Sequence, residues 1–236
     1  MGRGLKASGL MLAALIAANS HANVISATGA IQVIAPPASG QLGNLISDTT
    51  AYGFRERQNV LLPYDVSVDA IYPGLYLTDQ STGLVVRRGT RVDSFMIHGN
   101  SFSDGDYSTS FIGSITWDTI ILGVIFNRTG LNSTDGLLGF PSTVYPAGDR
   151  ESSFRELEMA GLQQYCAVDA SDCVGIQTDR RTLEFFISQS SMIDQIRILT
   201  AAKAPEPGTL ALLGFGLAGL GLSRRRTAYA TRSLNR

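Results

Sequence analysis

Three carboxylates come closest to catalytic chemistry in this sequence. Glu56, Asp93 and Glu184 are candidates for a pair of acids that hydrolyses a glycosidic bond, one as general acid and one as base or nucleophile. Such a pair needs carboxyl groups about 5 to 10 Å apart, and position along the chain does not establish that distance. No G-x-S-x-G, H-E-x-x-H or S-x-x-K pattern is present. We therefore predict no catalytic residue, and a glycoside hydrolase is the least favoured alternative.

His98 is one of only two histidines, and an imidazole can act as a general base. Residues 91–98 predict a strand, and Asp93 precedes His98 by five positions on it. Residues five apart on a strand point to opposite faces, so Asp93 is not placed to orient the ring. We interpret His98 as a hydrogen-bonded structural residue.

A loop rich in oxygen atoms follows that strand, from Asn100 to Asp106. Asp104 and Asp106, with Asn100 or Ser101, could bind Ca²⁺, which takes six to eight oxygen ligands. The spacing is not that of an EF-hand loop, and a plain Asp-Gly turn explains the same residues. We favour the turn and predict no cofactor, with Ca²⁺ as the alternative.

Cys166 and Cys173 are the only cysteines. Two thiolates alone make a poor zinc site, because structural zinc usually takes four ligands. In an exported chain they predict a disulfide that closes a surface loop. The loop-entropy estimate for so short a ring is roughly 2.5 kcal/mol of stabilisation.

The N-terminus predicts a secretory signal peptide over residues 1–22. Two basic residues precede the uncharged run Gly9–Ala18, and Ser20-His21-Ala22 has small residues at the two positions that signal peptidase reads. As a signal helix the run reaches only ~15 Å, about half a hydrocarbon core, so it is too short for a permanent anchor. We expect cleavage after Ala22, which makes Asn23 the mature N-terminus.

The C-terminus combines three features in one order. Pro205-Glu206-Pro207 comes first, and its prolines prevent a following helix from extending backwards. The uncharged run 209–222 predicts a transmembrane helix about 21 Å long. Arg224-Arg225-Arg226 follows, and the positive-inside rule places it in the cytoplasm. The domain before the run should therefore lie outside the inner membrane.

Residues 204–226 resemble the PEP-CTERM sorting signal, which has these features in this order. The resemblance implies that a membrane-embedded exosortase cuts near Pro-Glu-Pro and passes the protein to the surface of a bacterium that produces exopolysaccharide. It implies a membrane-anchored precursor in which residues 227–236 are a short cytoplasmic tail. The expected partners are exosortase and signal peptidase, with exopolysaccharide as a further candidate.

The middle of the chain resembles one group of PEP-CTERM surface proteins. The similar stretches are residues 54–60, 89–98, 120–125 and 194–200. That group has no assigned biochemical activity, so the resemblance implies a location rather than a reaction.

Charge is distributed unevenly along the chain. Seven of the 19 basic residues, but only one of the 20 acidic residues, lie outside the segment 23–203. The middle segment is therefore acidic. A nucleic-acid partner is not expected, because phosphate binding needs clustered Lys and Arg.

Short extended stretches separated by Gly, Pro, Asn and Asp predict an all-β domain over residues 23–200, a β-sandwich or jelly roll. We expect a first strand at 24–33, a hairpin that joins 75–78 to 84–87, and a buried strand at 120–126. Residues 127–134 suit a loop. Helical periodicity is weak apart from a short turn at 151–159.

Three functions remain open. We favour an exported, non-enzymatic cell-surface or matrix protein associated with exopolysaccharide or biofilm. The alternative is a lectin-like carbohydrate-binding module, and exposed aromatic rings beside a groove would favour it. The candidate rings are Trp117, Tyr72, Tyr76 and Tyr107. The hydrolase comes third.

Overall fold

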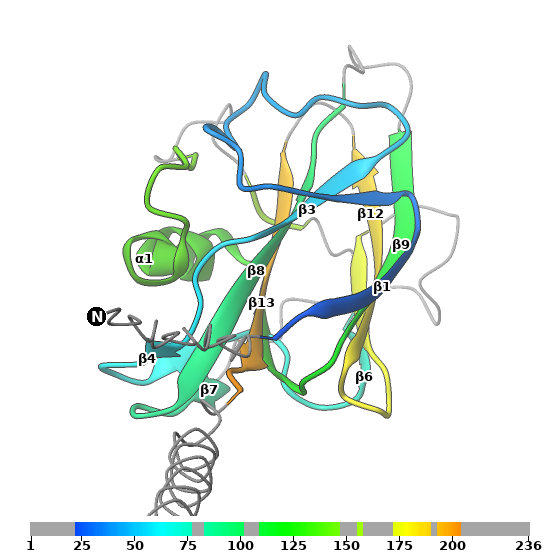
Figure 1. Cartoon of the computed structure of the whole chain (residues 1–236). Coiled ribbons are helices and arrows are strands. Elements are labelled where there is room, and N and C mark those ends of the chain that lie inside the picture. Colours follow the sequence, from blue (N-terminus) through cyan, green and yellow to red (C-terminus); the bar gives the residue numbers. More distant parts are fainter. Residues whose placement is uncertain are drawn as a thin grey trace, which may run out of the picture. The chain divides into compact units, whose positions relative to one another are not determined.

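Strands form most of the structure, a computed structural model that describes residues 22–76, 83–101, 109–146, 155–157, 172–189 and 193–203. All of these residues belong to the compact unit His21–Lys203. Within them lie thirteen strands and one short helix (Figure 1). The prediction of an all-β domain is confirmed.

One sheet has five antiparallel strands in the order β1-β9-β12-β11-β6. They are β1 (Val24–Gly29), β9 (Thr109–Trp117), β12 (Thr182–Gln189), β11 (Cys173–Ile176) and β6 (Gly74–Tyr76). Side chains of a strand alternate between its faces. On β12, Leu183, Phe185 and Ile187 are accordingly buried on one face, while Glu184 is exposed.

The second sheet has the order β10-β13-β8-β3-β2, and a short sixth strand also pairs with β8. Its strands are β10 (Ile121–Ile125), β13 (Asp194–Ala201), β8 (Arg91–Gly99), β3 (Ala51–Arg55), β2 (Ile31–Ile34) and β4 (Val60–Leu61). Only the β2–β3 pair is parallel among the described strand pairs. A separate antiparallel pair joins β5 (Val66–Ser67) to β7 (Val85–Val86).

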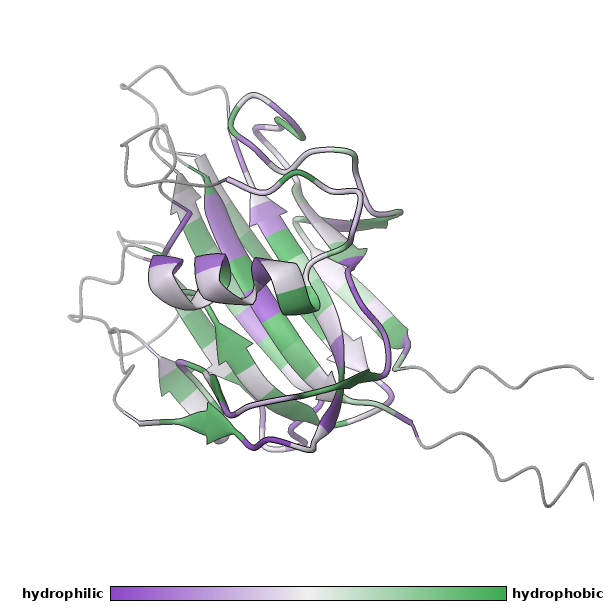
Figure 2. Cartoon of the chain, turned by 90° about the vertical axis from the view of Figure 1, so that its left-hand side faces the viewer, coloured by the Kyte–Doolittle hydropathy of each residue, from purple (hydrophilic) through white to green (hydrophobic). Residues whose placement is uncertain are grey.

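Strand β8 is buried on both faces, and its two faces enter different cores. Phe95 and Ile97 join a cluster that contains residues of both large sheets. Met96, between them, joins a second cluster with Leu131 and Leu138 of the helix. The six-stranded sheet therefore packs against the other sheet on one face and is covered by the helix on the other (Figure 2).

The expected first strand is two strands in different sheets. The chain turns at Gly29, which has φ +82° and ends β1, and it resumes at Ile31 in β2. A Cβ atom at Gly29 would lie 2.3 Å from the carbonyl oxygen of Ile112. Glycine is needed here for both the backbone conformation and the close approach of β9.

The expected hairpin between residues 75–78 and 84–87 is wrong. Strand β6 pairs with β11, and β7 pairs with β5. Two stretches on either side of a turn-like segment produced the expectation, but long-range partners determine the pairing. Residues 77–82 lie outside the described part.

A helix, α1 (Arg128–Leu138), replaces the loop expected after the buried strand. The Asn127 side chain accepts a hydrogen bond from the Gly130 amide at 2.7 Å, which caps the first turn. Leu131 and Leu138 face the sheet and are fully buried. The expected turn at 151–159 falls largely outside the described residues.

A buried arginine fastens α1 to the sheet. Arg197 of β13 has no exposed side-chain surface and donates two bonds of 2.7 Å to Glu56, just after β3. It also donates to Asp135 at 2.8 Å and to Thr134 at 2.7 Å, both on α1. Burial alone would lower the pKa of Arg197, but the Glu56 and Asp135 carboxylates outweigh it and raise that pKa.

A second guanidinium and an aromatic ring complete this cluster. Arg155, also without exposed side-chain surface, donates to Asp135 at 2.6 Å. The guanidinium carbons of Arg155 and Arg197 each lie 5.5 Å from the centre of the Tyr145 ring. Burial, followed by the charge of Glu56, raises the pKa of Tyr145, so its hydroxyl stays neutral.

Replacement of Gly29 by alanine should destabilise the fold through the clash with Ile112. Gly89→Ala is the matched control, because Gly89 has the same φ of +82° but no atom within 4 Å of an added Cβ. We expect Gly29→Ala to lower the free energy of unfolding by about 1–3 kcal/mol more than Gly89→Ala, in urea denaturation. Equal losses would show that β9 does not make this close approach.

Removal of the Arg197 charge should leave Glu56 buried without its partner. We expect Arg197→Met to lower the free energy of unfolding by about 3–5 kcal/mol, because an uncompensated buried charge is costly. The double variant Glu56→Gln/Arg197→Met should lose less. Arg87→Met, which breaks the exposed Arg87–Asp65 pair, should cost at most about 1 kcal/mol. A double variant less stable than Arg197→Met would contradict this interpretation.

Candidate functional site

A cleft of about 650 Å³ opens beside the end of β3. Its polar wall is the run Arg55–Gln58, which continues β3 beyond the sheet. Apolar side chains face that wall, among them Val24 of β1, Val33 of β2 and Phe140 after α1. Strand ends from both sheets therefore form the cleft, and it combines charged and apolar surface.

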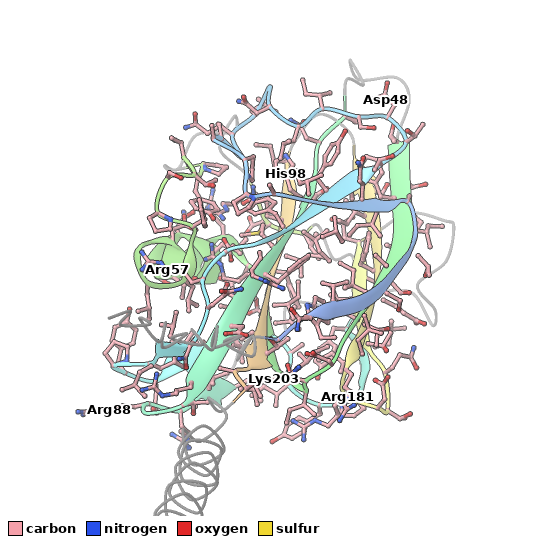
Figure 3. All side chains as sticks on the ribbon, viewed as in Figure 1. Asp48, Arg57, Arg88, His98, Arg181 and Lys203 are labelled. Atoms are coloured by element: carbon pink, nitrogen blue, oxygen red, sulfur yellow. The ribbon has the colours of Figure 1, made fainter. Side chains whose placement is uncertain are left out.

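The cleft carries positive charge. Its carboxylate, Glu56, is bound to Arg197 and accepts a further bond of 2.6 Å from the Ser94 hydroxyl. Arg57 donates from Nε to the Gly139 carbonyl at 3.0 Å and pairs with no described carboxylate (Figure 3). Arg55 donates to the carbonyl of Ala22 at 3.1 Å. In an otherwise acidic domain, two partly exposed guanidinium groups favour an anionic ligand.

The three candidate acids do not meet in one cleft. Glu56 lines the large cleft, whereas Glu184 lines a separate cavity of about 270 Å³ on the five-stranded sheet. Asp93 is buried and accepts hydrogen bonds from the backbone nitrogens of Ala22 and Asn59. Glu56, Asp93 and Glu184 therefore do not line one common cleft, as an acid pair that hydrolyses glycosides would.

His98 lies in the protein interior, where its hydrogen bonds give it a structural role. Gln195 donates to Nδ1 at 2.8 Å, so Nε2 carries the proton and points to the Asn44 carbonyl at 3.4 Å. Burial lowers the pKa of His98 to about 4; the Asn44 bond opposes that shift, and the charge of Arg155 adds to it. The ring is therefore neutral near pH 7 and has no exposed surface from which to meet a substrate.

The candidate stacking rings do not form a platform in the described part. Trp117 is only 2% exposed and packs edge-on against Phe95, with ring centres 5.5 Å apart. Tyr76 is partly buried, and its hydroxyl donates to the Tyr72 carbonyl at 2.9 Å. Tyr72 is exposed, and Tyr107 lies outside the described residues.

Other candidate positions are tested only in part. Cys173 is buried at the start of β11 and is not a free thiol, but Cys166 lies outside the described residues, so their disulfide stays a prediction. Asp104 and Asp106 also lie outside them. Where side chains are described, no three His, Cys, Asp or Glu residues gather as metal ligands would.

The sorting features also fall beyond the described residues. They are Pro205, Glu206, Pro207, the run 209–222, Arg224, Arg225 and Arg226. In the described part, α1 is the single helix, and it is neither long nor apolar enough to cross a bilayer.

Sequence comparison identifies the C-terminal segment. Residues 203–226 match the family model of the PEP-CTERM protein-sorting motif. No curated protein and no solved structure matches the chain. The match covers the apolar run and both of its flanking motifs, one residue longer than predicted. This chain therefore carries a PEP-CTERM sorting motif at residues 203–226, which marks it as an exported protein targeted to exosortase.

Proposed function

We propose that this protein is a non-enzymatic component of the bacterial cell surface or extracellular matrix that associates with exopolysaccharide. The sorting motif at residues 203–226 carries the proposal. Signal peptidase removes residues 1–22, exosortase removes the C-terminal segment, and a β-sandwich domain remains outside the cell.

The order of charges supports this route. The run 209–222 anchors the precursor, Arg224-Arg225-Arg226 holds its end in the cytoplasm, and Pro205-Glu206-Pro207 lies at the outer membrane face. The run is about 21 Å long as a helix, and arginine side chains that reach towards the headgroups help it to span. A cut near Glu206 then separates the domain from the membrane.

The buried polar residues of the described part support a binding or structural role rather than a catalytic one. Glu56 and Asp93 are both buried and hydrogen bonded, and His98 is neutral and enclosed. Catalytic acids and bases need access to substrate and a suitable pKa. The large cleft instead presents guanidinium groups, which bind anions without reacting with them.

Exosortase should determine the mass of the C-terminus. In a strain that has the matching exosortase, intact-mass measurement should show a protein that lacks residues 209–222. The same protein should keep them where the enzyme is deleted. Glu206→Ala should also prevent the cut, while Glu184→Ala, on an exposed strand position, should not. Retention of residue 209 onwards in both strains would refute the processing step.

The electropositive cleft supports a second, more specific candidate: a lectin-like site for an acidic polysaccharide. A carboxylate on a sugar ring matches the fork of the Arg57 guanidinium, and the apolar wall near Val33 and Phe140 suits the C–H face of the ring. Trp117 contributes no stacking surface because it is buried.

Binding of the host's own acidic exopolysaccharide should depend on Arg57. We expect Arg57→Ala to weaken the affinity about tenfold, since a hydrogen bond to a charged group contributes about 1.5–3 kcal/mol. Arg88→Ala is the matched control, because Arg88 is exposed and lies away from the cleft (Figure 3). Sedimentation with the purified polysaccharide measures both. Equal affinity of the two variants would exclude the cleft as the binding site.

A further inference from the structure

The two ends of the described unit meet at one carboxylate, that of Asp118, between β9 and β10. The backbone nitrogen of Asn23 lies 2.8 Å from Oδ1, and Lys203 Nζ lies 2.5 Å from Oδ2. Asn23 directly follows the predicted signal-peptide junction. Lys203 is the last described residue and lies two positions before Pro205 (Figure 3). Both predicted processing points therefore adjoin residues that Asp118 binds.

Asn23 is held on several sides. Its carbonyl accepts a bond of 3.0 Å from the Asp118 backbone nitrogen, and its side-chain amide donates to Asp118 Oδ2 at 3.3 Å. Arg55 donates to its side-chain oxygen at 3.2 Å. The first residues of a domain usually fray unless contacts hold them, and Asn23 has several such contacts.

Ala22 fills a buried position next to Asn23. Its exposed fraction is 4%, and its backbone nitrogen donates to the Asp93 carboxylate. Loss of Ala22 would open that position and leave the buried Asp93 oxygen facing it. The new terminal nitrogen of Asn23 would keep the Asp118 carboxylate as its partner, and the Asp93 carboxylate would border the position that Ala22 had filled.

Signal-peptide removal changes the chemistry of the Asn23 nitrogen. Water hydrolyses the Ala22–Asn23 bond: its oxygen goes to the new Ala22 carboxylate, and the released nitrogen takes up protons to become an ammonium group. An amide has one hydrogen-bond donor, whereas an ammonium has three and a positive charge. A charged donor also makes a stronger bond to a carboxylate.

We propose that Asp118, with Asp93 beside it, is a binding site for the α-ammonium group that signal peptidase creates at Asn23. The proposal rests on the proposed export and on cleavage after Ala22. Docking of the new terminus holds the start of β1 and, through the shared carboxylate, the Lys203 end of the chain. Removal of the signal peptide at the N-terminal end thereby also stabilises the position of Lys203, from which the sorting tail extends.

Both carboxylates and cations surround the site. Asp118 and Asp93 contribute two negative charges, and Lys203 and Arg55 contribute two positive ones. Burial opposes ionisation of Asp118, but bonds from Lys203 and Asn23 outweigh it and lower its pKa. Asp118 is therefore a carboxylate near pH 7. Its Oδ1 accepts from the Asn23 backbone nitrogen, and its Oδ2 accepts from both Lys203 and the Asn23 side-chain amide.

The test uses exported protein purified from its own host. Intact mass first establishes the N-terminus, which we expect at Asn23. An amine-reactive reagent is then applied near neutral pH, and peptide mapping follows the Asn23 amine. We expect labelling in Asp118→Asn to be at least about tenfold faster than in the natural protein, which corresponds to about 1.4 kcal/mol of ammonium–carboxylate attraction. Asp65→Asn, in an exposed ion pair, should leave the rate unchanged.

A second measurement does not depend on the folding of the variant. The natural protein is labelled folded and in concentrated urea, and the Asn23 amine should react at least about tenfold more slowly in the folded state. Equal rates in both comparisons would overturn the proposal. A mature chain that begins at His21 would also overturn it but would leave export intact. A full-length chain that stays inside the cell would overturn the proposed function itself.

Discussion

The guanidinium of Arg197 imposes the main constraint on this structure. It has no exposed surface, and a buried charge is tolerated only when partners compensate it. Glu56 supplies the principal charge, and Asp135 and the Leu131 carbonyl extend the contact to α1. The helix must therefore lie over β13, and the chain after β3 must turn towards it. One side chain thus connects the sheet, the helix and the wall of the cleft.

This constraint also determines what the cleft can do. The Glu56 carboxylate is bound to Arg197 below the surface, so its charge is compensated there rather than by Arg55 and Arg57. The run Arg55–Gln58 alternates in character, with its acid inside and its arginines at the rim. The charge at the rim of the cleft therefore favours an anionic ligand.

Regular alternation made much of the sheet predictable, and long-range contacts made the rest unpredictable. The apolar run 120–126 and the alternation around Phe185 correspond to β10 and β12. The break at Gly29 depends on the nearness of Ile112, which no local pattern encodes. Arg197 is a charged strand residue, and only the helix above it makes its face of the sheet an interior.

The sequence of α1 contains a weak helix signal. Asn127 is a good capping residue, and Leu131 and Leu138 are spaced for one helical face. Two glycines within α1 lower its helix propensity, so tertiary contacts with Arg197 must stabilise it. The cleft could not be located either, because its walls come from five separate parts of the chain.

The fold and the sorting route meet at the boundaries of the described unit. Strand β1 belongs to the five-stranded sheet and β13 to the other, yet Asn23 and Lys203, near the two ends of the described unit, both reach Asp118. The last strand ends at Ala201, and Lys203 makes the final described contact. A cut near Glu206 removes no described strand or core residue, so release from the membrane need not disturb the domain. The sorting motif and the folded domain are therefore formed by nearly separate parts of the chain, so removal of the first leaves the strands and core of the second in place.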